Sequence, residues 1–127
     1  MKKIIIIAVS VIFLAFAGRS VLFQDGIKEI TVQEVKQKAA DKEAIIFIDV
    51  RTPAEFTGPL GSIEGAVFLP LSELPDSIGS LQKYKDKEII VYCRSGNRSK
   101  TGAKILQDAG FNAVSMSGGM KAWNQVK

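Results

Sequence analysis

The residues best suited to carry out chemistry lie in one heptapeptide, Cys93-Arg94-Ser95-Gly96-Asn97-Arg98-Ser99, which contains the only cysteine of the chain. It follows the apolar run from Ile89 to Tyr92, typical of a strand, and precedes a run typical of a helix. A thiol between a strand end and a helix start lies where backbone N–H groups converge and the helix dipole is positive. Such surroundings lower a cysteine pKa and favour the reactive thiolate. Arg94 and Arg98 add positive charge, so we expect a pocket that attracts a small anion.

The absence of histidine narrows the chemistry open to this heptapeptide. With no histidine and one cysteine in 127 residues, Ser-His-Asp and Cys-His catalysis are excluded, as is an intramolecular disulfide. A metal site is not expected either, because histidine and cysteine are the usual ligands of zinc. We therefore expect a cysteine nucleophile that works without a histidine base, a metal or an organic cofactor.

Four stretches of the sequence, taken together, resemble the rhodanese family. The heptapeptide is similar to a rhodanese active-site loop, and Gly118-Gly119-Met120-Lys121-Ala122-Trp123 is similar to the family's C-terminal signature. Upstream, Asp49-Val50-Arg51-Thr52-Pro53-Ala54-Glu55-Phe56 resembles its strand-end Asp-Val-Arg segment, and Ile63-Glu64-Gly65-Ala66-Val67-Phe68-Leu69-Pro70 resembles its Gly-Ala-x-x-x-Pro segment. The motifs occur in the family's order over residues 30–127, which implies one rhodanese-like domain.

This resemblance implies a sulfurtransferase of the thiosulfate:cyanide type. The Cys93 thiolate would attack the outer sulfur of thiosulfate or a similar donor, release sulfite and hold a persulfide, which cyanide or a thiol then removes. Double displacement of this kind needs a good nucleophile and stabilised negative sulfur, but no histidine base. The implied partners are a small anionic sulfur donor and a thiophilic acceptor.

The resemblance also implies which residues bind the substrate, namely Arg94, Ser95, Gly96, Asn97, Arg98 and Ser99. Their backbone N–H groups would surround the persulfide, and Gly96 would allow the tight path of the loop. Arg94 and Arg98 would attract the donor anion, although Arg98 equally suits bracing the loop and Arg94 equally suits exposure to water. The hydroxyl and amide side chains are expected to make loop and helix-cap hydrogen bonds.

The elements that position these residues alternate between strands and helices. Apolar runs predict strands at 44–50, 66–69, 89–92 and 113–116, with a short strand near residue 30. Helices are predicted after Thr31, at 53–56, after Ser72, at 99–109 and at 120–126. This order predicts an α/β fold with a central, mostly parallel sheet and helices on both faces. Asp49 and Cys93 both end strands, so they are expected at one sheet edge, with Asp49 and Arg51 paired as loop support.

Two other functions remain open at this point. The first is a phosphatase or arsenate reductase with a Cys-loop-Arg cradle, although those cradles have a longer loop than the four residues between Cys93 and Arg98. The second is a noncatalytic rhodanese-fold module that binds a partner. The chain also has Gly61-Ser62-Ile63 where family members often carry Gly-His-Ile, which leaves the donor preference open.

The N-terminus predicts a location outside the cytoplasm. Residues 1–17 combine a basic start, an apolar run and Ala15-Phe16-Ala17, the pattern of a signal peptide, and the run is short for a membrane anchor. Either alternative leaves a tether at 18–28 and a domain at 29–127, in the periplasm or held at the inner membrane by an uncleaved segment. Removing Lys2 and Lys3 lowers the net charge from +4 to +2, and no basic block is present, so nucleic acid is not an expected partner.

Overall fold

The strands that the structure describes form one sheet in which all pairings are parallel. The computed structural model describes residues 26–127, so the predicted leader or anchor (1–17) and residues 18–25 of the predicted tether lie outside the described residues. The strand order is β1-β5-β4-β2-β3. Their bounds are β1 Glu29–Ile30, β2 Ile45–Asp49, β3 Val67–Phe68, β4 Glu88–Tyr92 and β5 Ala113–Met116.

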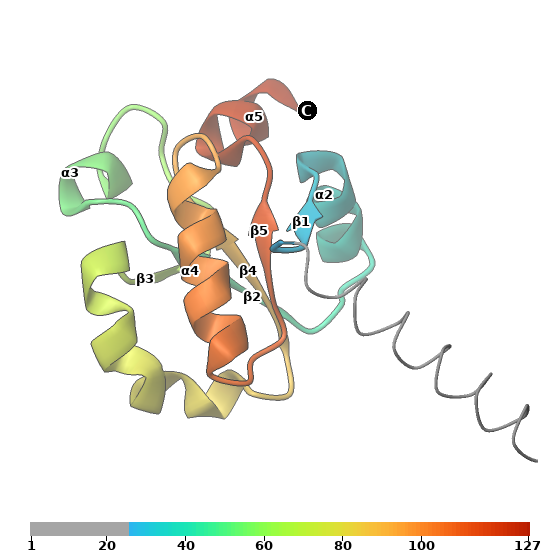
Figure 1. Cartoon of the computed structure of the whole chain (residues 1–127). Coiled ribbons are helices and arrows are strands. Elements are labelled where there is room, and N and C mark those ends of the chain that lie inside the picture. Colours follow the sequence, from blue (N-terminus) through green and yellow to red (C-terminus); the bar gives the residue numbers. More distant parts are fainter. Residues whose placement is uncertain (1–25) are drawn as a thin grey trace, which may run out of the picture.

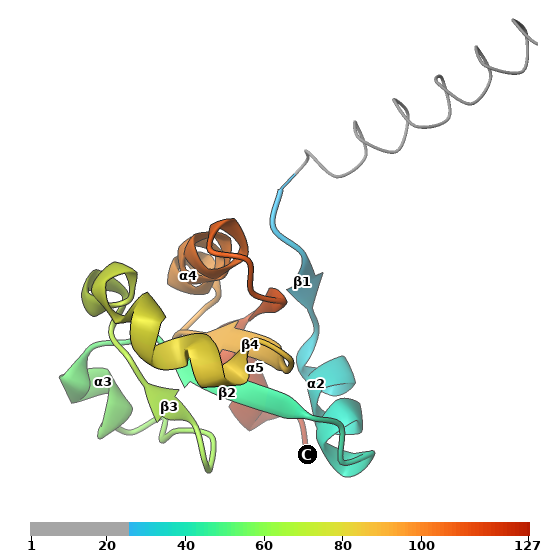
Figure 2. The same ribbon diagram turned by 90° about the horizontal axis from the view of Figure 1, so that it is seen from below.

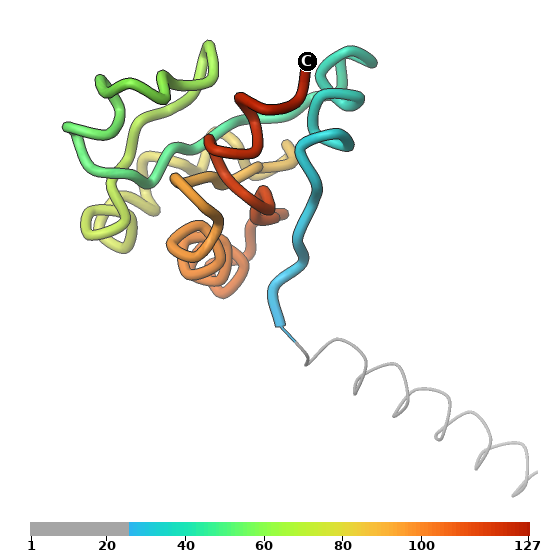
Figure 3. Tube along the Cα trace, turned by 90° about the horizontal axis from the view of Figure 1, so that it is seen from above, coloured from blue at the N-terminus to red at the C-terminus, as the bar shows by residue number. Residues whose placement is uncertain are grey.

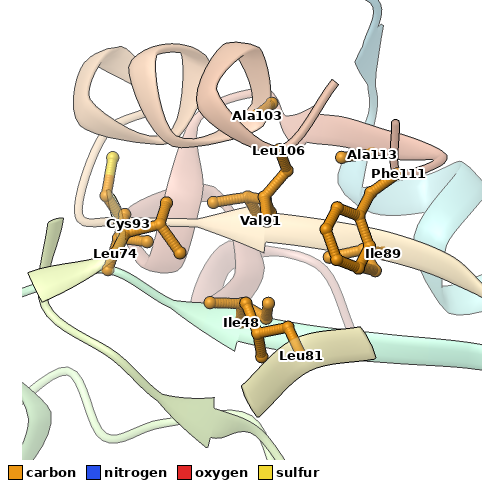
Figure 4. Close-up of a cluster of buried hydrophobic side chains, with 11 residues drawn as sticks. Ile48, Leu74, Leu81, Ile89, Val91, Cys93, Ala103, Leu106, Phe111 and Ala113 are labelled. Carbon is orange, nitrogen blue, oxygen red and sulfur yellow. The ribbon is translucent and has the colours of Figure 1, made fainter. Parts of the chain in front are cut away.

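The central strand β4 is apolar on both faces. Ile89, Val91 and Cys93 contribute to one hydrophobic core, whereas Ile90 and Tyr92 contribute to the core on the opposite face. Successive side chains of a strand point to opposite faces, and a strand covered on both sides is therefore a continuous apolar run. The alternation also assigns the cysteine, one residue past the strand, to the face that carries α4 (Figure 4).

Helices cover both faces of the sheet, as predicted (Figures 1 and 2). On one face lie α4 (Asn97–Asp108) and the 3₁₀ segment η2 (Pro75–Tyr84), which supply Ala103, Leu106 and Leu81 to the core. On the other face lie α2 (Val32–Ala40) and α5 (Gly119–Gln125), which supply Val35 and Met120. The short helix α3 (Pro53–Phe56) lies beside β3, where the Phe56 and Phe68 rings stack with centroids 4.5 Å apart. The predicted fold class is confirmed.

Three helix predictions differ from the structure. The helix predicted after Ser72, with Ser72 as its N-cap, is instead the 3₁₀ segment η1 (Leu71–Glu73), which begins before Ser72 and has no side-chain cap. Pro75 does not end the helical region but begins η2, because proline is tolerated at the first position of a helix. Helix α4 begins at Asn97, two residues before the predicted start, and α5 begins at Gly119 instead of Met120.

The N-terminal end of the described chain packs on the domain. Ile27, within the segment predicted as a tether, contacts the core beneath α4, and the Lys28 carbonyl accepts a hydrogen bond from the Ser115 N–H at 3.1 Å. The Thr31 hydroxyl accepts from the Glu34 N–H at the start of α2, as the sequence predicts. Across residues 26–127, the helices are too short or too polar to span a bilayer.

Candidate active site

The Cys93 sulfur lies at the carboxyl end of β4 and points toward the start of α4 (Figure 4). The residue is 1% exposed, so the sulfur is held inside the loop that joins the two elements. The Gly96 N–H donates to the sulfur at 3.1 Å, and the Ser99 hydroxyl lies 3.6 Å from it. Gly96 adopts φ +108°, a left-handed conformation that favours glycine and allows this tight turn.

These contacts favour the thiolate. Burial raises the pKa of Cys93, but hydrogen bonds from the Ser99 hydroxyl and from the backbone N–H groups of Ser99, Gly96 and Ser95 lower it more. The net result is a Cys93 pKa below its ordinary value, reached with neutral donors and without histidine. A buried sulfur whose negative form is stabilised in this way is suited to nucleophilic attack and to holding a negatively charged sulfur adduct.

Helix α5 holds the other side of the same loop. The Met120 N–H donates to the Cys93 carbonyl at 2.9 Å, and the Lys121 N–H donates to the Arg94 carbonyl at 3.1 Å. Figure 3 shows α5 (red) beside the start of α4 (orange). Gly119 permits this approach, because its backbone lies directly against the Cys93 and Arg94 peptide groups. The loop carbonyls are therefore fixed on the α5 side, and the loop N–H groups are left for the sulfur.

The end of β2 contributes a buried ion pair beside the loop. Arg51 Nη2 lies 2.7 Å from Asp49 Oδ2, and Arg51 Nε donates to Asp49 Oδ1 at 2.9 Å. Both side chains are at most 1% exposed, and Arg51 Nη2 also donates to the Gly61 carbonyl at 2.7 Å. Asp49 pairs in register with Tyr92, the residue before Cys93. The expected ion pair is thus present, and through Arg51 it also joins the end of β2 to the segment around Gly61, between α3 and β3.

A second ion pair occupies Arg98. Its Nη1 and Nη2 donate to the two carboxylate oxygens of Glu55, each at 2.7 Å. The hydrogen bonds from Arg98 lower the pKa of Glu55 to about 2, helped by donors from Thr52. Arg98 therefore braces the loop against α3. Sequence reasoning missed Glu55, although the Thr52–Glu55 capping box at the start of α3 signals its location.

The remaining predicted loop residues occupy different surroundings. Arg94, Ser95 and Asn97 are exposed, and Gly96 is the N-cap of α4 without a side-chain hydrogen bond, so the helix-cap role expected for Ser95 and Asn97 is wrong. Ser99 is fully buried, and its hydroxyl donates to the Gly96 carbonyl at 3.0 Å. Gly96 and Ser99 thus lie within hydrogen-bond distance of the sulfur, and the Ser95 N–H adds a further hydrogen bond to it.

A cavity of about 430 Å³ opens beside the loop. Its lining combines apolar side chains with charged ones, namely Ala54, Pro59 and Leu60 with Arg51, Glu55 and Arg94. Arg94 is its exposed cation, since Arg51 is buried against Asp49. In the part of the chain that the structure describes, no group of three or more cysteine, aspartate or glutamate side chains is arranged to hold a metal ion.

A buried cysteine in a loop between a parallel strand and a helix, at the carboxyl edge of the strands, is the arrangement of a rhodanese-like α/β domain. The rhodanese-like domain family matches residues 31–126. YtwF of Bacillus subtilis is 39% identical over 97 residues, covering 76% of this chain and 90% of that protein. A sulfurtransferase of Allochromatium vinosum is 35% identical over 98 residues, covering 76% and 88%.

The same relationship is found among solved structures. A rhodanese-like domain protein from Staphylococcus aureus superposes with a TM-score of 0.69 at 33% identity, covering 76% of this chain and 91% of that one. The chain therefore belongs to the rhodanese-like domain family, and the activity of the family to which it belongs is sulfur transfer.

Proposed function

We propose that the protein transfers a sulfane sulfur from thiosulfate, or a similar small anion, to a thiophilic acceptor through a persulfide on Cys93. The observation that carries this proposal is the convergence of Gly96 and Ser99 donors on a buried sulfur whose pKa is lowered. Donors of this kind stabilise negative charge wherever it develops in the site. The same donors serve the thiolate before attack and the persulfide after it.

The transfer consists of two displacements at sulfur. In the first, the Cys93 thiolate attacks the outer sulfur of thiosulfate, a new S–S bond forms, and the bond within the donor breaks so that its electron pair leaves with sulfite. In the second, cyanide or a thiolate attacks the outer sulfur of the persulfide and the Cys93 thiolate is released. Neither step needs a proton to be removed from carbon, nitrogen or oxygen, which agrees with a chain that lacks histidine.

The charges around the loop support an anionic donor. Arg94 is exposed at the cavity and stands outside the Asp49–Arg51 and Glu55–Arg98 ion pairs. It is therefore the arginine best suited to attract the donor by its charge. The cavity of about 430 Å³ has room for an acceptor larger than cyanide, and its apolar wall, formed in part by Leu60, suits an organic thiol.

The alternative of a phosphatase or arsenate reductase receives less support from the geometry. Such an enzyme requires an arginine turned toward the bound oxyanion, whereas the fork of Arg98 is taken up by Glu55 at 2.7 Å. The four residues between Cys93 and Arg98 also make a small ring. We infer that this ring encloses a single sulfur atom in preference to a tetrahedral oxyanion.

The location outside the cytoplasm is also proposed, on the sequence of residues 1–17. Fractionation of cells that express the chain is expected to find it in the periplasm or at the inner membrane. Recovery of the intact chain from the cytoplasm alone would contradict this location without affecting the proposed chemistry.

Intact-mass spectrometry of the full chain tests the sulfur transfer. Incubation with thiosulfate is expected to add the mass of one sulfur atom, and cyanide is expected to remove it, as a covalent double displacement requires. Cys93→Ser and Cys93→Ala should show neither change. No added mass on a free thiol, or turnover of an aryl phosphate that depends on Cys93, would refute the proposal.

A further inference from the structure

A buried pair of hydroxyl groups lies behind the reactive sulfur. Ser115, on β5, and Ser99, on α4, are both 0% exposed, and their Oγ atoms are 2.7 Å apart. Val114 and Met116, the neighbours of Ser115 in the strand, pack in the core on the opposite face, so Ser115 faces α4. The sulfur of Cys93 lies 3.6 Å from the same Ser99 oxygen. Ser115 Oγ, Ser99 Oγ and the Cys93 sulfur therefore form a continuous row of polar atoms inside the domain.

The buried hydroxyl of Ser115 has a single side-chain partner within residues 26–127. It lies in an otherwise apolar strand, Ala113–Met116, and a buried hydroxyl costs free energy unless it is hydrogen-bonded. Ser99 is the only side chain among the described residues to which the Ser115 hydroxyl is hydrogen-bonded. Any effect of this hydroxyl on the sulfur therefore acts through Ser99.

Counting protons shows what Ser115 can contribute. The Ser99 hydroxyl has one proton and faces three acceptors: the Gly96 carbonyl at 3.0 Å, Ser115 Oγ at 2.7 Å and the Cys93 sulfur. While the thiol is protonated, its S–H donates to Ser99 Oγ. A negative sulfur can only accept hydrogen bonds, and when the Ser99 proton turns toward it, the Ser99 oxygen is free to accept one in turn. The Ser115 hydroxyl is in position to supply that hydrogen bond.

We propose that Ser115 is a positioning residue of the sulfur site, which stabilises negative sulfur on Cys93 by donating a hydrogen bond to Ser99. The chain of donors runs from Ser115 to Ser99 to the sulfur, and each bond in such a chain polarises the next. The effect on the Cys93 thiolate does not depend on which compound donates sulfur. Its extension to the persulfide rests on the proposed function.

Fixed charges also face the site and must remain constant in a test. They are Asp49 and Arg51 at the end of β2, Glu55 on α3, Arg94 in the loop and Arg98 on α4. On the far side of β5, Glu29 pairs with Lys100 at 3.4 Å. Replacing the neutral Ser115 by another neutral residue changes none of these charges. A shift in the pH dependence of Cys93 alkylation in such a variant then measures the effect of the hydrogen bond between Ser115 and Ser99.

The matched variants are Ser115→Thr and Ser115→Val, which have the same shape but differ in the hydroxyl. Val114→Ala, on the same strand but facing the opposite core, controls for loosening of the sheet. The rate of iodoacetamide alkylation is measured against pH on the full chain, in which Cys93 is the only thiol. This readout requires no sulfur donor, so it remains informative even if thiosulfate proves not to be a substrate.

Ser115→Val is expected to reduce the thiolate fraction at neutral pH about three- to tenfold and to move the alkylation profile to higher pH, the scale of one lost hydrogen bond. Ser115→Thr should restore the wild-type profile, and Val114→Ala should leave it unchanged. If thiosulfate forms a persulfide, its formation on Ser115→Val should slow by the same factor and recover at high pH. Equal profiles for the Thr and Val variants, or an equal shift in Val114→Ala, would overturn the assignment.

Discussion

Replacement of Gly119 by alanine is expected to disrupt the loop that holds the reactive cysteine. A Cβ built on Gly119 would lie 2.5 Å from the Arg94 carbonyl carbon and closer still to the Cys93 carbonyl oxygen. Both atoms belong to backbone carbonyl groups whose oxygens accept the hydrogen bonds from α5, so no side chain can turn aside to make room. Either the loop or the first turn of α5 must therefore move.

The cost follows from two terms. Gly119 has φ +55°, where an alanine loses about 1 kcal/mol relative to glycine. Relief of the overlap with the Cys93 and Arg94 peptides adds about 1 to 3 kcal/mol, the range for overpacked sites. The expected loss is therefore about 2 to 4 kcal/mol of the free energy of unfolding. Movement of the loop by about 1 Å would in addition slow attack by the sulfur about a hundredfold.

Urea unfolding and the rate of persulfide formation measure these two effects on the same preparations. Gly79→Ala is the matched control, because a Cβ at that position in η2 meets no heavy atom within 4 Å. We expect the control to unfold and react like the wild type. A Gly119→Ala protein with the wild-type urea midpoint and rate would show that the contact between α5 and the loop does not hold the sulfur site.

Three further changes probe the ion pairs and the Tyr92 phenol by urea unfolding. Glu55→Gln should cost about 1 kcal/mol at neutral pH, since the pair with Arg98 is partly exposed. Because the folded pKa of Glu55 is about 2 and its ordinary value is 4.5, this contribution is present above pH 4.5 and is lost as the pH falls toward 2; an unchanged difference at pH 2 would contradict it. Asp49→Asn removes the charge that faces the buried Arg51 guanidinium and should cost about 3 to 5 kcal/mol, so a loss under 1 would count against the pair. Tyr92→Phe leaves a buried backbone N–H without its acceptor and should cost about 1 to 2 kcal/mol; wild-type stability would mean that water replaces the phenol.

The sheet edge was predictable because its signals are local. The run from Ile89 to Tyr92 reads as a strand buried on both faces, and parallel strands bring their carboxyl ends to one edge, which fixes Asp49 near the cysteine loop. The 3₁₀ segment after Pro75 was missed because proline both ends and begins helices, and local sequence does not separate the two.

The contacts that hold the loop were less predictable, because they join residues far apart in the chain. Arg98 meets Glu55 across 43 positions, and the carbonyl of Cys93 meets α5 only after β5 has returned the chain to the sheet. Ser115 gave no signal, since a single serine in a short strand resembles a solvent-facing residue until burial is known. Such pairings depend on the topology more than on any local pattern.

The two sides of the loop explain how a negative sulfur is stabilised without histidine. A peptide group has its N–H and C=O on opposite sides, so fixing the Arg94 carbonyl against α5 turns the Ser95 N–H toward the sulfur. The next peptide adds the Gly96 N–H as a second donor. The charges of Arg51 and Arg98 are meanwhile matched by carboxylates. Stabilisation of the sulfur thus depends mainly on neutral dipoles, which are held in place before reaction and need little rearrangement as charge develops.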